Sequence, residues 1–268
     1  MKLNGTQIAE FEERGYLFFP NLLDAKEVAA LQSTLPEIMN RPGPEVIRET
    51  GDPTVARLVF GAHVFSEPFR RLSLRPNLLH PVRQLLGDEV YLHQSRLNPK
   101  QGFGHGAAWD WHQDYPPWHA IDGMPEPKAM NYAVFLDDVN EFNGPIAFIP
   151  SSHRQGELAS EAEVLPGITP LYTMNTETIA TLAEANGIVS PKGPAGSAVF
   201  FDSCMAHTST PNISPWPRNI VYLTCNRTDN FIRTPTRPHY YAGNDFEAIS
   251  PLPDDCLSNA PHTQHLAT

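Results

Sequence analysis

The chain has 268 residues, which is enough for one domain with a substantial core. Its formal net charge of −11 argues against a nucleic-acid-binding protein, because such a protein would carry a basic face. The three cysteines lack metal-type spacing, and the sequence shows neither a signal peptide nor an apolar run long enough for a membrane helix, so we expect reduced thiols in a cytoplasmic protein.

The first 88 residues are expected to be mainly helical. A short helix over residues 6–14 would end at Gly15, and residues 16–23 would form a strand whose pairing Pro20 limits. Asp24 and Glu27 have capping-box spacing at the start of a helix that continues to residue 40. Another helix would end at Gly87. We expect the helices of this part to flank a β-rich core formed by later residues.

From residue 89 onward, short apolar runs alternate with Gly and Pro turns. Several such strands in succession favour a sandwich or a barrel. Roughly forty residues, 154–195, separate two of these strands and include one predicted helix over 176–187, and a connection of this length is typical of a lid or binding loop. We therefore expect a single domain over residues 1–268, with a helical part at about 1–88, a core at about 89–245 and a lid-like insertion at about 154–195.

The stretch AAWDWHQDYPPWH, residues 107–119, concentrates three tryptophans, two histidines and two aspartates. On an extended strand, His112 and Asp114 would point from the same face. A histidine and a carboxylate placed in this way supply two ligands of the 2-His-1-carboxylate triad that holds iron(II). The pair alone is common in chains of this composition and also fits a surface hydrogen bond, so a third ligand has to come from elsewhere.

A candidate third ligand is His207, which directly follows an apolar strand. Arg218 stands eleven residues later, at the start of the next predicted strand. If these two strands are antiparallel neighbours, Arg218 returns beside the metal, where its guanidinium can bind a carboxylate through two parallel hydrogen bonds. Taken singly, the two residues fit a turn histidine and a surface arginine; with His112 and Asp114 they describe a site for iron and a dicarboxylate.

These residues lie within longer motifs that resemble the iron(II)/2-oxoglutarate dioxygenases of the phytanoyl-CoA hydroxylase superfamily, especially the hydroxylases of free amino acids and of ectoine. The motifs run in family order from about residue 90 to 245: YLHQSRLN, WHQDYPPWHAIDGMP, FLDDVNEFNGPIAFIPSSH, GPAGSAVFFDSCMAH, PNISPWPRNIVYLTCNRTDN and RPHYYAGND. The resemblance implies a mainly β fold, a double-stranded β-helix (a cupin-like jelly-roll) with flanking N-terminal helices.

The resemblance also implies residue roles. The catalytic iron ligands would be His112, Asp114 and His207, and the tryptophans would form the wall of a dry pocket around them. The residues expected to contact 2-oxoglutarate are Arg218, Ser209, Trp109, Asn98 and Arg96. The substrate would meet Gln94, Trp118 and Arg237, and Arg237 would pair with its carboxylate. The alternative for the residues outside the metal triad is an ordinary structural role as core aromatics, buried polar groups or solvated arginines.

The implied reaction is hydroxylation of a small free amino or imino acid with iron(II), O2 and 2-oxoglutarate, giving succinate and CO2, with ascorbate helpful in vitro. The retained Asp114 favours hydroxylation over halogenation, because related halogenases have a small residue there. WHQDY together with CNRTDN favours L-proline or L-pipecolic acid, whereas HQSR and DGMP resemble ectoine hydroxylases, and EFNGP and PNISP also resemble leucine-type hydroxylases.

Two other classes of function remain open on the sequence. One is a cupin-type metalloenzyme that does not use 2-oxoglutarate, and the other is a non-catalytic β-sandwich module that binds a small ligand. We expect a monomer or a homodimer, with neither a nucleic acid nor a membrane as partner.

Overall fold

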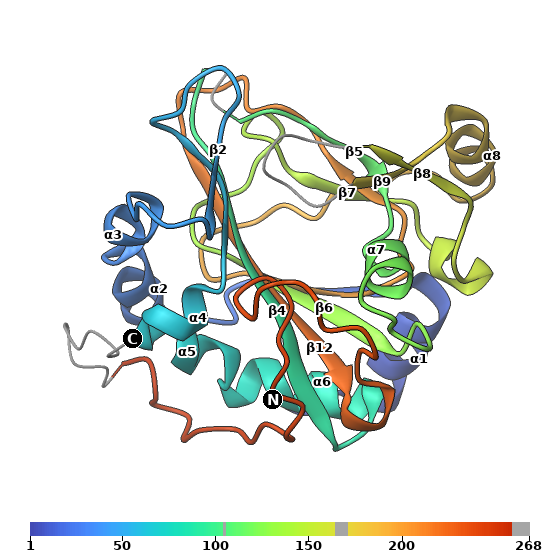
Figure 1. The fold of residues 1–268 in the computed structure, drawn as a ribbon, viewed down its shortest axis with the longest axis horizontal. Coiled ribbons are helices and arrows are strands. Elements are labelled where there is room, and N and C mark those ends of the chain that lie inside the picture. The colour runs from blue at the N-terminus through green and yellow to red at the C-terminus, as the bar shows by residue number, and fades with distance from the viewer. Residues whose placement is uncertain (104–105, 164–170, 259–268) are drawn as a thin grey trace.

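Two antiparallel β-sheets form the centre of the molecule, which a computed structural model describes for residues 1–103, 106–163 and 171–258 (Figure 1). The larger sheet has the strand order β1–β10–β6–β12–β4–β3–β2 and the smaller sheet has the order β7–β11–β5–β9–β8. The strands of the large sheet are β1 (Tyr16–Phe19), β2 (Val46–Arg48), β3 (Ala56–Phe60), β4 (Val90–Lys100), β6 (Ala129–Phe135), β10 (Ala198–Asp202) and β12 (Arg218–Arg227). Those of the small sheet are β5 (Trp109–His112), β7 (Ile146–Phe148), β8 (Ser160–Glu163), β9 (Leu171–Met174) and β11 (His207–Ser209).

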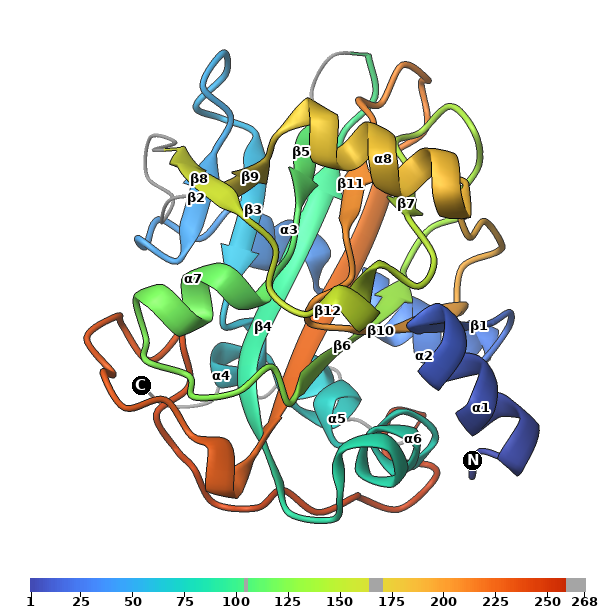
Figure 2. The same cartoon turned by 90° about the vertical axis from the view of Figure 1, so that its right-hand side faces the viewer.

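Helices cover the outer side of each sheet. Figures 1 and 2 show α2, α5 and α6 outside the large sheet and α8 across the small one. The bounds are α1 (Gly5–Arg14), α2 (Ala25–Gln32), α3 (Leu35–Met39), α4 (Ala62–Phe65), α5 (Glu67–Ser73), α6 (Pro76–Leu86), α7 (Tyr115–Ala120) and α8 (Thr176–Asn186), with the 3-10 turns η1 (Ser152–Gln155) and η2 (Thr228–Asn230). The predicted mainly β, two-sheet architecture with flanking N-terminal helices is therefore confirmed.

The alternation of side chains along β12 separates two environments. Val221, Leu223 and Cys225 point to the outer face and join the core formed with the N-terminal helices. Ile220 and Tyr222 point to the inner face and pack toward the small sheet. Because residues two apart share a face, Arg218 and Thr224 also face inward. The large sheet thus presents its polar side chains to the space between the two sheets.

Several local predictions for the N-terminal part are confirmed. Gly15 closes α1 in the left-handed region at φ +79°, and α6 ends at Gly87. Asp24 and Glu27 form the capping box at the start of α2. The single helix expected up to residue 40 is wrong, because the chain breaks after Gln32 and restarts as α3 with a proline in its first turn.

The first 88 residues, expected to be mainly helical with one strand at 16–23, contain that strand in shorter form as β1 (Tyr16–Phe19) and two further strands that were not predicted. Three strands of this part join the large sheet: β1 pairs with β10, and β3 connects β2 to β4. In the latter pairing Val59 lies opposite Leu97. The partners are far apart in the sequence, so the pairing depends on tertiary contacts that local patterns do not reveal.

The connection over residues 154–195 contains the predicted helix, α8, and also two strands. β8 and β9 pair with each other, and β9 continues the small sheet beside β5. Residues 164–170 of this connection lie outside the described residues. The described part therefore builds directly onto the sheet that carries His112.

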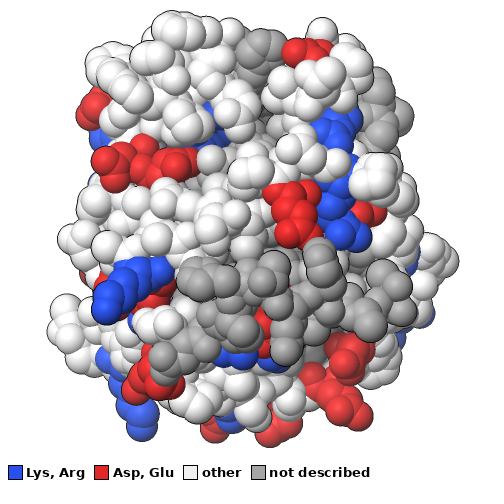
Figure 3. Space-filling view, turned by 90° about the vertical axis from the view of Figure 1, so that its left-hand side faces the viewer, with Lys and Arg blue, Asp and Glu red and all other residues white. Residues whose placement is uncertain are grey.

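The surface carries charges of both signs. On the face drawn in Figure 3, acidic and basic side chains are interspersed among uncharged ones. None of the helices in the described ranges is both long enough and apolar enough to cross a bilayer.

A buried ion pair ties α2 to the N-terminus of α6. Glu27 and Arg75 are 2% and 7% exposed, and two hydrogen bonds of 2.6 and 2.7 Å join them. Replacing Glu27 by Ala leaves the Arg75 charge buried without its partner, so the free energy of unfolding should fall by about 3–5 kcal/mol. Urea denaturation followed by circular dichroism measures this loss.

The matched control is Asp88→Ala, which removes the exposed partner of Arg83. An exposed pair contributes about 0–1 kcal/mol, so this variant should unfold nearly as the parent does. Equal losses in the two variants would contradict the assignment of the Glu27–Arg75 pair as a structural link.

Candidate active site

Two adjacent strands of the small sheet bring the candidate metal ligands together. His112 ends β5, His207 begins β11, and the two residues lie opposite each other in the antiparallel pairing. Their ring centroids are 4.1 Å apart, and His112 Nε2 and His207 Nε2 each lie 3.9 Å from the Asp114 carboxylate. One ligand atom from each of the three residues lies within 4.8 Å of the others.

Asp114 reaches this cluster in a way that differs from the expectation of an extended strand. β5 ends at His112, and Asp114 has helical backbone angles (φ −79°, ψ −27°) directly before α7. Its amide donates to the carbonyl of Ser203, in the turn that leads to His207. The carboxylate is therefore placed by the start of a helix, whereas strand pairing places the two histidines.

Both imidazoles are held with Nε2 toward the cluster. His112 Nδ1 donates to the carbonyl of Asp110 at 2.6 Å, and His207 Nδ1 donates to the carbonyl of Met205 at 2.9 Å. A carbonyl only accepts, so these bonds fix the proton on Nδ1 and leave the Nε2 lone pair free for a metal. Burial lowers the pKa of His112 to about 3 and also lowers the pKa of His207, so both rings are neutral at physiological pH.

The Asp114 carboxylate is bound from the large sheet. Arg96 donates to its two oxygens at 2.9 and 2.7 Å, and Asn131 Nδ2 donates to Oδ2 at 3.0 Å. Thr224 in turn donates to the Asn131 side-chain oxygen at 2.6 Å. Although burial opposes ionisation, the positive charge and hydrogen bonds of Arg96 hold the pKa of Asp114 well below its usual value. The site therefore has an anionic carboxylate with two neutral imidazoles, the donor set suited to iron(II).

The expectation that Arg96 faces the cosubstrate stays a prediction, and the structure adds a contact of Arg96 with Asp114. Arg96 lines the same cavity, but its Nη1 and Nη2 are occupied by the ligand carboxylate. Its position in β4 matches the inward face that also carries Gln94 and Asn98. We therefore assign Arg96 to holding Asp114.

Arg218 lies at the first residue of β12, in the large sheet, whereas His207 lies in the small sheet. The expectation that their two strands pair is wrong: β12 pairs with β4 and β6, so Arg218 approaches from the opposite sheet. Its side chain is fully buried and donates to the carbonyl and side-chain oxygens of Asn98 at 3.3 and 3.1 Å. A buried guanidinium without a carboxylate partner can bind an anion.

Two orphaned polar atoms support a ligand at this end. Among the described residues, Arg218 Nε and Ser209 Oγ are buried and have no hydrogen-bond partner. Buried polar atoms are rarely left without partners in proteins, so a ligand that accepts from both fits this position. The carboxylate expected of 2-oxoglutarate has the required chemistry, and Asn98 and Ser209 line the cavity beside it.

The three tryptophans of the opening stretch do not share one role. Trp109 and Trp118 line the cavity, whereas Trp111 packs on the other side of the small sheet against α8. The pocket wall that we expected to include all the tryptophans therefore includes two. The Arg57 guanidinium stacks on the Trp109 ring, 4.4 Å from its centroid.

One cavity of about 790 Å³, partly open to solvent, connects the cluster to the remaining candidate residues. Gln94, Trp118 and Arg237 all line it, and none of the three belongs to β5 or β11. The further lining residues come from seven parts of the chain and are mostly apolar: Leu58, Phe60, Pro117, Ile146, Leu171, Tyr222 and Tyr241, with the polar Gln113 and Thr208.

Sequence reasoning missed several residues of the site. Lys100 lies opposite Arg218 in the β4–β12 pairing, is 1% exposed, and burial lowers the pKa of its ammonium to about 6. Asn131 lies two and four residues before Ala133 and Phe135 of β6, so it points to the same inner face of the strand. This spacing could have predicted that Asn131 faces the site once the inner face of β6 was known. Tyr241 and Leu171 carry no local signal, because only the folded chain brings them to the cavity.

Comparison with known proteins places these features in context. The family model described as phytanoyl-CoA dioxygenase (PhyH) matches residues 11–220. The ectoine dioxygenase of Bordetella bronchiseptica is 38% identical and aligns over 93% of this chain and 86% of its own. The L-proline trans-4-hydroxylase of Streptomyces griseoviridis is 36% identical over 91% of this chain and 94% of its own. The crystal structure of EctD from S. alaskensis with 2-oxoglutarate and 5-hydroxyectoine superposes with a TM-score of 0.80, at 34% identity, over 90% of this chain and 84% of that one.

The hold of Asn131 on Asp114 can be tested through metal affinity. Replacing Asn131 by Ala removes one donor to the carboxylate and frees Thr224, so the affinity for iron(II) should fall about 10- to 100-fold. Anaerobic titration with iron(II), checked by cobalt(II) absorption spectra, measures this change without turnover.

Asn226→Ala is the matched control, since Asn226 is an equally buried asparagine of the large sheet that binds Tyr91 and Asn230 instead. It should leave iron affinity within about threefold of the parent. An unchanged affinity in Asn131→Ala would rule out a role of this amide in holding the ligand.

Proposed function

The chain belongs to the phytanoyl-CoA dioxygenase family, and we propose that it hydroxylates a small cyclic acid whose carboxylate lies beside a ring nitrogen, with ectoine as the first candidate. It is an iron(II)- and 2-oxoglutarate-dependent dioxygenase. When bound, iron and 2-oxoglutarate supply the oxidising power that inserts oxygen into a C–H bond, while 2-oxoglutarate is converted to succinate and CO2.

One observation carries the proposal: a single cavity joins the metal-binding cluster to two chemically different ends. At one end lie Ser209, whose hydroxyl has no hydrogen-bond partner, and Asn98, which accepts from the buried Arg218; these groups suit the distal carboxylate of 2-oxoglutarate. At the other end lie Arg237, Gln94 and Trp118, which suit a small acid. We assign His112, Asp114 and His207 to the metal between them.

The polar groups at the substrate end favour a ligand with both a carboxylate and an N–H group. Gln94 Nε2 donates to the carbonyl of Tyr241 at 2.9 Å. The side-chain oxygen of Gln94, Oε1, therefore points away from that carbonyl and can accept from a substrate N–H. Arg237 supplies donors for the carboxylate. Trp118 is 2% exposed and supplies an apolar surface for the ring between them.

The charges around the cavity favour a delocalised cation. Asp114 is the one acidic side chain among the described lining residues, and Arg96 already binds it. A compact ammonium would be buried here without a counter-ion, which is costly. The amidinium of ectoine is delocalised over three ring atoms and can lie against the face of Trp118, as weakly hydrated cations do.

L-Proline is the second candidate. The L-proline trans-4-hydroxylase of Streptomyces griseoviridis aligns over 94% of its own length, and L-proline, like ectoine, is a ring compound with a carboxylate beside a nitrogen. The sequence favours proline or pipecolic acid, but the ectoine dioxygenases among the relatives support ectoine better. Free leucine-type amino acids lack the ring and rank third.

The chain's own residues would orient this substrate and keep water away. Leu171 from the connection 154–195 lines the cavity, so we retain the proposal that this connection covers the pocket. Gln113, between the two ligands of β5 and α7, donates to the carbonyl of Gly156 at 2.9 Å and accepts from the amide of Leu158 at 2.8 Å. These bonds attach the start of the connection to the metal site.

A substrate panel tests the proposal directly. Protein reconstituted with iron(II) would be incubated with 2-oxoglutarate, O2 and, singly, ectoine, L-proline, L-pipecolic acid or L-leucine, with succinate and substrate mass both followed. Ectoine should gain one oxygen in step with succinate, with a kcat/KM at least about tenfold above that of L-proline. The reverse order would replace ectoine by proline, and product without 2-oxoglutarate would contradict the cosubstrate assignment.

The role of Arg218 gives a second test. Arg218→Met removes the buried charge-assisted bonds to the distal carboxylate, so the KM for 2-oxoglutarate should rise about 10- to 100-fold. Arg227→Met is the matched control, because Arg227 ends the same strand but pairs with Asp229 on the surface. Iron affinity should be unchanged in both variants, and equal KM values for 2-oxoglutarate would contradict the assignment.

A further inference from the structure

Arg237 does not stand free in the cavity, because a fully buried carboxylate holds one edge of its guanidinium. Arg237 Nε donates to Asp122 Oδ1 at 2.7 Å, and its Nη2 donates to Asp122 Oδ2. Asp122 is 0% exposed and does not line the cavity, whereas Arg237 does. The carboxylate thus binds the guanidinium from behind, on the side away from the pocket.

The remaining donors of Arg237 have a defined direction. A guanidinium has five N–H donors. Asp122 accepts from Nε and from one N–H of Nη2, which together form the side edge of the group. The Tyr241 ring covers one face, with its centroid 4.3 Å from the Arg237 guanidinium carbon. The end edge of the guanidinium, formed by one N–H of Nη1 and one N–H of Nη2, remains unoccupied by Asp122. Its two N–H groups are parallel, so a carboxylate can accept from both in a bidentate pair.

The segment that bears Arg237 depends on the same turn for its position. Residues 231–247 contain neither a helix nor a strand. The amide of Thr234 donates to the carbonyl of Asp122 at 2.8 Å, and the amide of Arg233 donates to that of Gly123 at 3.2 Å. Gly123 has φ +69°, and a Cβ there would lie 3.0 Å from the Thr234 hydroxyl, so the close approach favours glycine.

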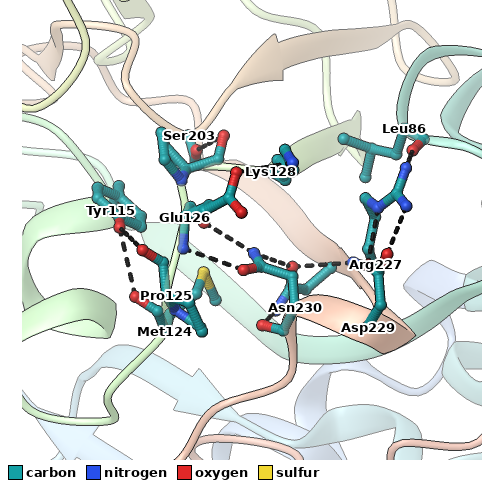
Figure 4. A network of polar contacts seen from close by, with 12 residues as sticks. Leu86, Tyr115, Met124, Pro125, Glu126, Lys128, Ser203, Arg227, Asp229 and Asn230 are labelled. Atoms are coloured by element: carbon teal, nitrogen blue, oxygen red, sulfur yellow. Dashed lines mark hydrogen bonds and ion pairs between the residues drawn. The ribbon is translucent and has the colours of Figure 1, made fainter.

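A second set of contacts fixes the other end of the loop after α7. Figure 4 shows Asn230 exchanging bonds with Glu126, at 3.0 and 2.7 Å, and Tyr115 donating to the carbonyls of Met124 and Pro125. The loop 121–126 is therefore attached to α7 through Tyr115 and, through Asn230, to the start of the segment that leads to Arg237. These hydrogen bonds restrain the position of the loop that carries Asp122.

We propose that Asp122 is the positioning residue of the substrate-binding end: by holding the side edge of Arg237, it directs the Nη1–Nη2 edge into the cavity to receive the substrate carboxylate. This rests on the proposed function, in which Arg237 meets that carboxylate. Asp122 touches neither metal nor substrate, and it acts through Arg237. A rotated Arg237 would present a single donor, and the preference for an acid over its neutral amide would decrease.

The test uses the full-length protein loaded with iron and 2-oxoglutarate without oxygen. The affinities for ectoine, for L-proline and for the carboxamide of each are measured by calorimetry in the parent, in Asp122→Asn and in Asp229→Asn. Asp229 is the matched control because it pairs with an arginine of the same region on the surface. Asp122→Asn should weaken binding of the acid about 10- to 100-fold, lower its preference over the carboxamide and leave the KM for 2-oxoglutarate unchanged.

A double-mutant cycle separates positioning from a general structural role. In an Arg237→Gln background, Asp122→Asn should change acid affinity by less than about threefold, because its effect passes through the missing guanidinium. The preference for acid over carboxamide is a ratio within one protein, so partial unfolding of a variant does not imitate its loss. Asp229→Asn should match the parent in every measurement.

The outcomes distinguish the two proposals. If the parent binds neither acid, the proposed substrate class is wrong, and the role of Asp122 is rejected with it. If the parent binds one of them and Asp122→Asn binds it equally well, or loses affinity to the same extent without Arg237, the positioning role is wrong while the substrate class stands.

Discussion

Burial of the large sheet on both faces is the constraint on which the rest of this structure depends. Its outer face packs against the N-terminal helices largely with apolar side chains, whereas the polar side chains that build the site, such as Arg96, Asn131 and Thr224, face inward. A polar group enclosed between two sheets needs a partner or a ligand. The active site is consequently a set of inward polar side chains on β4, β6 and β12, completed by the histidines of the small sheet.

Arg96 and Arg237 line the cavity, a third arginine, Arg218, is buried against the lining residue Asn98, and their partners give each arginine a different task. Arg96 is bound to Asp114 and Arg237 to Asp122, whereas Arg218 has no acidic partner among the described residues. An uncompensated buried guanidinium attracts the ligand with the most negative charge, and 2-oxoglutarate carries two carboxylates. The compensated Arg237 suits a substrate with one carboxylate and a positive nitrogen, so the charge pattern separates the two ligands within one cavity.

The sequence is informative where function depends on neighbours along the chain. The capping box of Asp24 and Glu27, the glycine after α1 and the spacing of His112 and Asp114 are all local, and the structure contains each of them. The sheet that receives Arg218 and the partners of β3 depend on pairings between distant segments, so local patterns mispredicted or missed them. Asp122 belongs to a recognisable DGMP motif, but its contact with Arg237 spans more than a hundred residues and has no signature in the sequence.

The two ends of the cavity also differ in how they are built. The metal ligands and Arg218 sit at the ends of strands or beside them, where pairing across the sheets fixes their positions. The substrate end relies on Arg237 and Tyr241, which belong to irregular chain held by the turn at Asp122 and by the β4 carbonyl that binds Gly243. Irregular segments tolerate change more readily than paired strands. Motifs along the strands therefore identify the reaction, whereas the proposed selection of a cyclic acid would depend on a segment whose geometry only tertiary contacts determine.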